Sequence, residues 1–246
     1  MNKKILALLL AFAMVFSTMT VAFADESAAI GADAKALEIM GVLKGDTGTV
    51  TPEYLVKETT RMQAAIMYLR LKGLEDEAIA FTGTANFADA GTMVWGEGKA
   101  MMAYLKANPQ LGWIGGDGGR FNPFNTITAQ EYYKVMLEAL GYKQTTAEAE
   151  GDFSWTEVMA FAAGKGLTKV ADVAKFTNND LATATMEALK INYKGMTKTL
   201  AVKLVDEGMI SKAAAVEAGL YAEDIAAAVK SAKALGNSTV EVTFED

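Results

Sequence analysis

The residue most suited to binding chemistry is Arg61, which follows Thr60 at the start of an apolar segment. An arginine guanidinium group is planar and can hold a carboxylate through two parallel hydrogen bonds. Helix initiation gives no reason for a cation at this position, because the amino-terminal end of the helix dipole is positive. We therefore treat Arg61 as a candidate ligand for an acidic group.

The composition excludes many familiar kinds of catalysis. The 246 residues include no histidine and no cysteine, which rules out disulfides, thiolate nucleophiles, Cys/His zinc sites and Ser-His-Asp triads. Paired carboxylates could hydrolyse a glycosidic bond, but the acidic residues mostly occupy predicted helix caps and exposed faces. A formal net charge of −7 without a basic cluster argues against nucleic-acid binding. We predict a protein that is not an enzyme and has no cofactor or metal.

Three threonines have the spacing of a helix capping box, at Thr60–Gln63, Thr128–Glu131 and Thr177–Asp180. In this motif the threonine hydroxyl and the side chain three residues later satisfy free N–H groups of the first helical turn. Capping is the better explanation of these residues, and a further role in binding stays open for the first two pairs.

The hydrophobic pattern predicts a chain built almost entirely of helices. Apolar residues recur at helical spacing over 60–72, before Gly73, and over 128–140, before Gly141. Only 238–244, after the Ala-rich stretch 225–235, alternates like a strand. Shorter helical patterns cover 33–40, 98–107, 155–163, 177–189, 197–207 and 211–218.

A repeated glycine turn connects these elements. The sequence GVLKGD at 41–46 is matched by GWIGGD at 112–117, and in both copies a proline follows six residues later, at Pro52 and Pro123. A weaker third copy begins at 164–167. Units of this kind cannot bury their apolar faces alone, so we expect the copies to pack against one another.

Two other features of the turns leave alternatives open. The glycine run 115–119 could hold a phosphate through backbone N–H groups, but it lacks the Gly-Lys-Ser/Thr of a P-loop, so a tight turn is the better explanation. Trp113 and Trp155 could each stack on a sugar ring or fill the core. The core is favoured for Trp155, and both roles stay open for Trp113.

The order of these motifs resembles the S-layer homology (SLH) family of Gram-positive cell-surface proteins. The match is best at Phe87–Asp89 and over 111–142, where the turn is followed by RFNP at 120–123 and ITAQE at 127–131. The resemblance implies a mostly α fold in which three helix-turn-helix repeats pack as a pseudo-threefold helical module. It also implies binding of secondary cell-wall polysaccharide, commonly a pyruvylated one.

The three repeats would cover about 28–74, 86–142 and 153–219, and the third is degenerate. The first keeps Thr60–Gln63, which is similar to the family's Thr-Arg-Ala-Glu motif, whereas the second has Ala129 in place of the arginine. By this resemblance the glycan-binding residues are Arg61, Thr60, Gln63, Asp46, Trp113, Asp117, Arg120, Thr128 and Glu131.

The two ends of the chain have different predicted roles. Residues 1–24 read as a secretory signal peptide, with a short basic start, an apolar run and small residues before the cleavage site. Residues 25–220 would form the repeat module. Residues 221–246 would be an Ala-rich linker and the first strand of a following domain, which resembles the Ig-like modules that follow such repeats.

The sequence therefore predicts an exported cell-wall anchor, without a membrane span after signal cleavage. The alternative is a structural subunit of a surface lattice that self-associates and binds glycan weakly or not at all. For the anchor we expect one pocket that contains Arg61, with Asp46 or Asp117 beside it. We also expect Arg61→Ala to weaken wall binding at least about tenfold with little change in stability.

Overall fold

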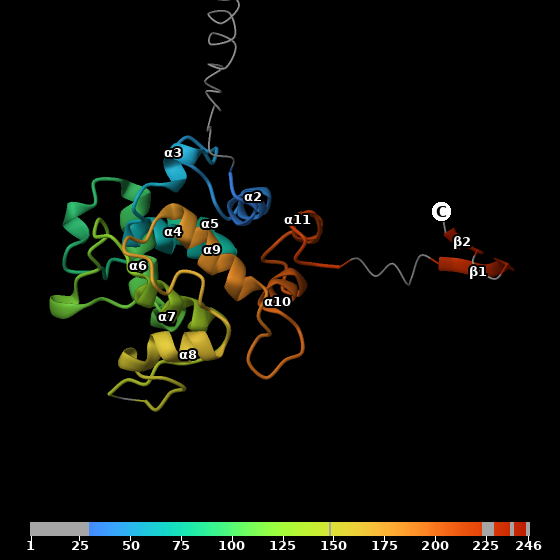
Figure 1. Ribbon diagram of the computed structural model, residues 1–246. Coiled ribbons are helices and arrows are strands. Elements are labelled where there is room, and N and C mark those ends of the chain that lie inside the picture. The colour runs from blue at the N-terminus through green and yellow to red at the C-terminus, as the bar shows by residue number, and fades with distance from the viewer. Residues whose placement is uncertain (1–29, 148, 223–228, 237–238, 245–246) are drawn as a thin grey trace, which may run out of the picture.

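The computed structural model describes residues 30–147, 149–222, 229–236 and 239–244, and these are mostly helical, as predicted (Figure 1). The predicted signal peptide lies outside the described residues. The α-helices are α2 (Ala32–Ile39), α3 (Pro52–Leu55), α4 (Arg61–Leu71), α5 (Glu75–Ile79), α6 (Gly96–Ala107), α7 (Ala129–Ala139), α8 (Val158–Gly164), α9 (Asn178–Leu189), α10 (Leu200–Asp206) and α11 (Lys212–Glu217). Short 3-10 helices are η1 (Ala90–Thr92), η2 (Pro109–Leu111), η3 (Asp117–Gly119) and η4 (Trp155–Glu157).

The three predicted capping boxes are all present, at the starts of α4, α7 and α9. In α4 the backbone N–H of Thr60 donates to Gln63 Oε1 over 2.9 Å, and in α7 that of Thr128 donates to Glu131 Oε2 over 2.8 Å. Thr177 closes the third box, at the start of α9. Local sequence therefore fixes where the three longest capped helices begin.

The segments that lead into these three helices are hydrogen-bonded to one another. The N–H of Thr59 donates to Phe176 O over 2.9 Å, and the N–H of Ile127 donates to Thr59 O over 3.0 Å. The Thr59 side chain is fully buried and its hydroxyl contacts Asn178 Oδ1 at 2.8 Å. The starts of α4, α7 and α9 are thus held together around residue 59.

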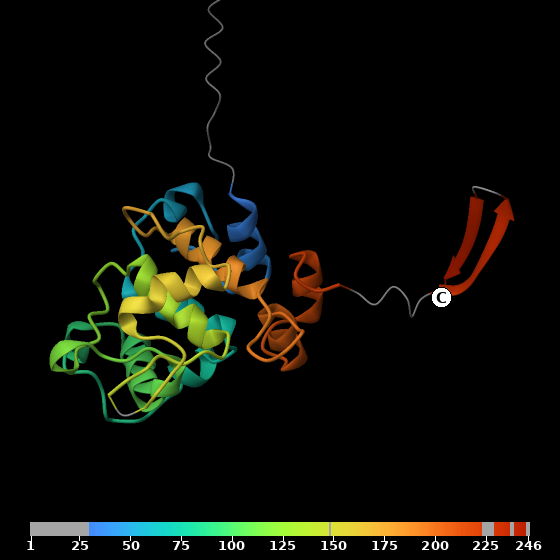
Figure 2. The same cartoon turned by 60° about the horizontal axis from the view of Figure 1, so that its bottom comes forward.

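The core lies between these helices and consists of apolar side chains and buried tyrosines. Helix α7 packs against α8 and α9, and Tyr132, which has no exposed surface, places its hydroxyl 2.7 Å from that of Thr185 on α9. In two views α10 and α11 lie to one side of this body (Figures 1 and 2).

The structure differs from the predicted pattern in several elements. Helices α3 and α5 were not predicted. Residues 155–157 form the 3-10 helix η4, so that α8 begins only at Val158. The Ala-rich stretch is not wholly a linker. It contains strand β1 (Val229–Gly236), which pairs antiparallel with β2 (Thr239–Phe244). The predicted single strand is therefore one half of a hairpin, drawn apart from the helices in Figure 2.

Candidate functional site

A cavity of about 380 Å³ lies where the start of α4 meets the start of α7 and the glycine loop, which we define as residues 112–119. Its volume is within the range of about 300–1,000 Å³ found for small-molecule sites. We call it the Arg61 cavity. Its lining includes Arg61, Trp113, Asn125, Glu131, Lys134 and Trp155.

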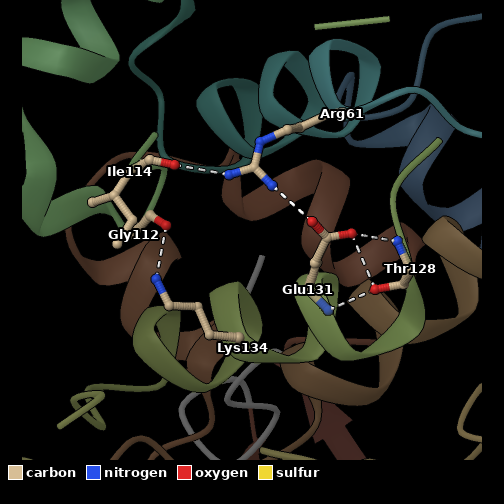
Figure 3. Close-up of polar contacts among 6 residues, drawn as sticks. All are labelled: Arg61, Gly112, Ile114, Thr128, Glu131 and Lys134. Carbon is tan, nitrogen blue, oxygen red and sulfur yellow. Dashed lines mark hydrogen bonds and ion pairs between the residues drawn. The ribbon is translucent and has the colours of Figure 1, made fainter. Parts of the chain in front are cut away.

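Arg61 connects the start of α4 to the glycine loop and to α7, as Figure 3 shows. Its Nη1 atom lies 3.1 Å from Glu131 Oε1, and its Nη2 atom donates to the carbonyl oxygen of Ile114 over 2.9 Å. The side chain is only 18% exposed. Burial lowers the pKa of Arg61, and the Glu131 carboxylate opposes that shift. Both terminal nitrogens of the guanidinium group therefore have partners within the protein.

Two aromatic rings cover the Arg61 guanidinium group. Its Cζ atom lies 5.2 Å from the ring centre of Phe121 and 5.8 Å from that of Trp113, within the range of cation–π contacts. In the described part of the protein, Nε of Arg61 and Nε1 of Trp113 are buried and have no hydrogen-bond partner. Packing against the rings therefore adds to the hydrogen bonds that hold the arginine.

Glu131 serves the helix cap and the arginine at once. One carboxylate oxygen accepts from the backbone N–H of Thr128, at 2.8 Å, and from its hydroxyl, at 3.0 Å. The other oxygen faces Arg61 (Figure 3). The capping box of α7 therefore positions the counterion of Arg61.

One turn further along α7, Lys134 fixes the start of the glycine loop. Lys134 is 5% exposed, donates to the carbonyl oxygen of Gly112 over 2.8 Å, and forms an ion pair with Glu138 at 2.9 Å. Burial raises the pKa of Glu138, and Lys134 opposes that shift. Gly112 has a φ of +84°, and a Cβ atom there would lie 1.9 Å from Glu138 Oε2. The positive φ favours glycine here, and an added methyl group would also displace the Glu138 carboxylate.

Asp89 holds the segment that follows the glycine loop. Its carboxylate accepts from the backbone N–H groups of Phe121, at 2.8 Å, and Asn122, at 2.7 Å. Burial alone would raise the pKa of Asp89, but these donors outweigh it and hold the pKa below its ordinary value of 3.8. Asp89 is not among the predicted site residues, although the predicted resemblance rests in part on the segment Phe87–Asp89.

The two tryptophans of the cavity lining differ in their exposure. Trp155 is 44% exposed and lines the cavity, so its predicted place in the core is wrong. Trp113 also lines the cavity but is only 1% exposed, which leaves no ring face for a sugar. The exposed aromatic surface of the site is therefore that of Trp155.

The structure brings Arg61, Trp113 and Glu131 together but leaves the other predicted site residues outside the cavity lining. Thr60, Gln63 and Thr128 act in caps. The expectation that an aspartate lies beside Arg61 is wrong. Asp46 forms an ion pair with Lys57. Asp117 is exposed on the glycine loop, and Arg120 is exposed directly after it.

The chain is similar over part of its length to a known cell-surface protein. No known family model matches the chain. An alignment of 149 residues, which covers 57% of the chain, is 30% identical to a protein described as "Cell surface protein" from Thermoanaerobacter kivui. The chain covers 19% of that protein's length, about a fifth. Within the residues that the structure describes, no helix has the length and hydropathy needed to cross a membrane.

Proposed function

We propose that this chain is a cell-surface anchoring module that binds secondary cell-wall polysaccharide non-covalently. The observation that carries the proposal is the Arg61 cavity, whose wall contains an exposed tryptophan, Trp155, and the carboxamide side chains of Asn125 and Gln144. The similarity to a cell surface protein and the signal-peptide pattern of 1–24 support a location at the cell wall.

The lining of the cavity suits a carbohydrate. Sugar rings present apolar C–H faces and a rim of hydroxyl groups, so they need an aromatic surface and polar groups that both donate and accept. Trp155 offers the first. The carboxamide groups of Asn125 and Gln144 offer the second. We propose binding without catalysis, because Glu131, the carboxylate of the lining, is engaged by Arg61 and by the cap.

The proposal includes three related units in a pseudo-threefold arrangement. It is supported by the three capping boxes and by the hydrogen bonds that join the segments before α4, α7 and α9. The site would then lie between the first and second units, because Arg61 comes from one and Trp113 and Glu131 from the other.

A structural subunit of a surface lattice is the second candidate. The engagement of Arg61 with Glu131 and Ile114 favours it, since the arginine then serves to hold two units together. In that case the chain would self-associate and would bind the wall weakly or not at all.

Binding to cell-wall sacculi from the producing bacterium separates the two candidates. The anchor predicts saturable binding that disappears when the secondary polymer is removed with hydrofluoric acid. Trp155→Ala should weaken binding at least about tenfold, as expected for an aromatic anchor. Trp95→Ala is the matched control, because Trp95 is 42% exposed and lies outside the cavity lining. No binding by the wild type would favour the structural subunit. Wild-type affinity in the Trp155→Ala protein would contradict a glycan site at the Arg61 cavity.

A further inference from the structure

We infer that the Arg61 cavity takes an uncharged sugar residue of the wall polymer and discriminates against an acidic one. The inference rests on the proposed function and names the chemical class of its ligand. It follows because both cations of the cavity wall are already paired with carboxylates, and because the chain has a net negative charge.

The first cation, Arg61, is already paired with a carboxylate. Its Nη1 atom faces Glu131, its Nη2 atom donates to the carbonyl oxygen of Ile114, and its Nε atom is buried. An acidic ligand would have to compete with Glu131 for this charge, and the Thr128 cap holds Glu131 in place through two further contacts.

The second cation, Lys134, is also neutralised. It is 5% exposed and contacts Glu138 at 2.9 Å and the carbonyl oxygen of Gly112 at 2.8 Å. Among the described residues of the lining, both positive charges are therefore paired with carboxylates. The whole chain carries a net charge of −7, so its long-range field repels anions as well.

The groups that remain are matched to a neutral ligand. Trp155 presents an exposed aromatic face, and Asn125 and Gln144 carry carboxamides that donate and accept hydrogen bonds. A hydroxyl or acetamido group can pair with such partners without any charge. A carboxylate, which only accepts, would meet the Glu131 charge across the cavity at a cost.

Sacculi whose carboxylates have been converted to amides test this directly. We expect wild-type protein to bind amidated and untreated sacculi within about twofold, and to keep its affinity in about 1 M sodium chloride, where the screening length is about 3 Å. A loss of tenfold or more on amidation or in high salt would overturn the inference while the proposed function stood. No binding to untreated sacculi would remove the proposed function, and the inference with it.

Glu131→Gln provides the converse test with an acidic polysaccharide, polygalacturonate, as the probe. Glutamine keeps the cap, because Gln63 makes the same contacts in α4. The variant frees one donor of Arg61, so we expect its affinity for polygalacturonate to rise at least about tenfold over that of the wild type.

Glu157→Gln is the matched control. Glu157 occupies the same position in the capping box of Ser154 and forms no ion pair with the described residues. It should leave polygalacturonate binding unchanged. Equal binding of the probe by wild type and a folded Glu131→Gln protein would overturn the inference.

Discussion

Replacing Arg61 by alanine should lower the stability of the protein markedly, in contrast to the expectation from the sequence. The substitution removes an ion pair whose two side chains are 18% and 31% exposed, and a charged hydrogen bond to the carbonyl oxygen of Ile114. It also removes two cation–π contacts, with Phe121 and Trp113. A hydrogen bond to a charged group contributes about 1.5–3 kcal/mol and a cation–π contact about 0.5–1 kcal/mol.

Together these losses, reduced for the partial exposure of Glu131, predict a decrease of about 2–4 kcal/mol in the free energy of unfolding. Urea denaturation followed by circular dichroism measures it. Lys35→Ala is the control, because Lys35 is 57% exposed and its ion pair with Glu38 should contribute less than about 0.5 kcal/mol. A double-mutant cycle with Glu131→Gln should give a coupling of at least about 1 kcal/mol. An Arg61→Ala protein within about 0.5 kcal/mol of the wild type would refute the structural role of this arginine.

Three further substitutions test the supports of the cavity. Thr128→Ala should lower the free energy of unfolding by about 1 kcal/mol through the lost cap of α7, measured by urea denaturation. Gly112→Ala should lower it by at least about 2 kcal/mol, since the residue has a φ of +84° and the new methyl group would meet Glu138; unchanged stability would contradict this close approach. Asp89 has a lowered pKa, so its contribution is present above its unfolded value of 3.8 and is lost as the pH falls through its folded pKa. The stability difference between the wild type and Asp89→Asn should therefore shrink on acidification, and a difference independent of pH would contradict the assignment.

Features of the fold that depend on neighbouring residues could be predicted from the sequence. The caps at Thr60, Thr128 and Thr177 involve side chains three residues apart, and helices α4 and α7 end before glycines with positive φ, Gly73 and Gly141. These signals are local, because capping and helix termination are settled within one turn.

Features that depend on distant residues could not be predicted in this way. The sequence predicts that Arg61 is free to bind an acidic ligand. Its counterion, Glu131, lies 70 residues further along the chain, and a hydrophobic pattern does not indicate such a distant ion pair. Trp155 was assigned to the core on its residue type, whereas η4 leaves it exposed at the cavity. Strand β1 could not be predicted, because an Ala-rich segment has no alternating pattern and alanine favours helices.

Hydrogen–deuterium exchange in the presence of solubilised wall polysaccharide tests the central claim most directly, because it locates the binding surface on the unmodified protein. We predict slower exchange in peptides that cover the glycine loop, 112–119, and η4 with Trp155, and no change in the segment 196–207, which lies outside the Arg61 cavity. Protection confined to another part of the chain, or none at all at saturating polymer, would contradict a glycan site at this cavity.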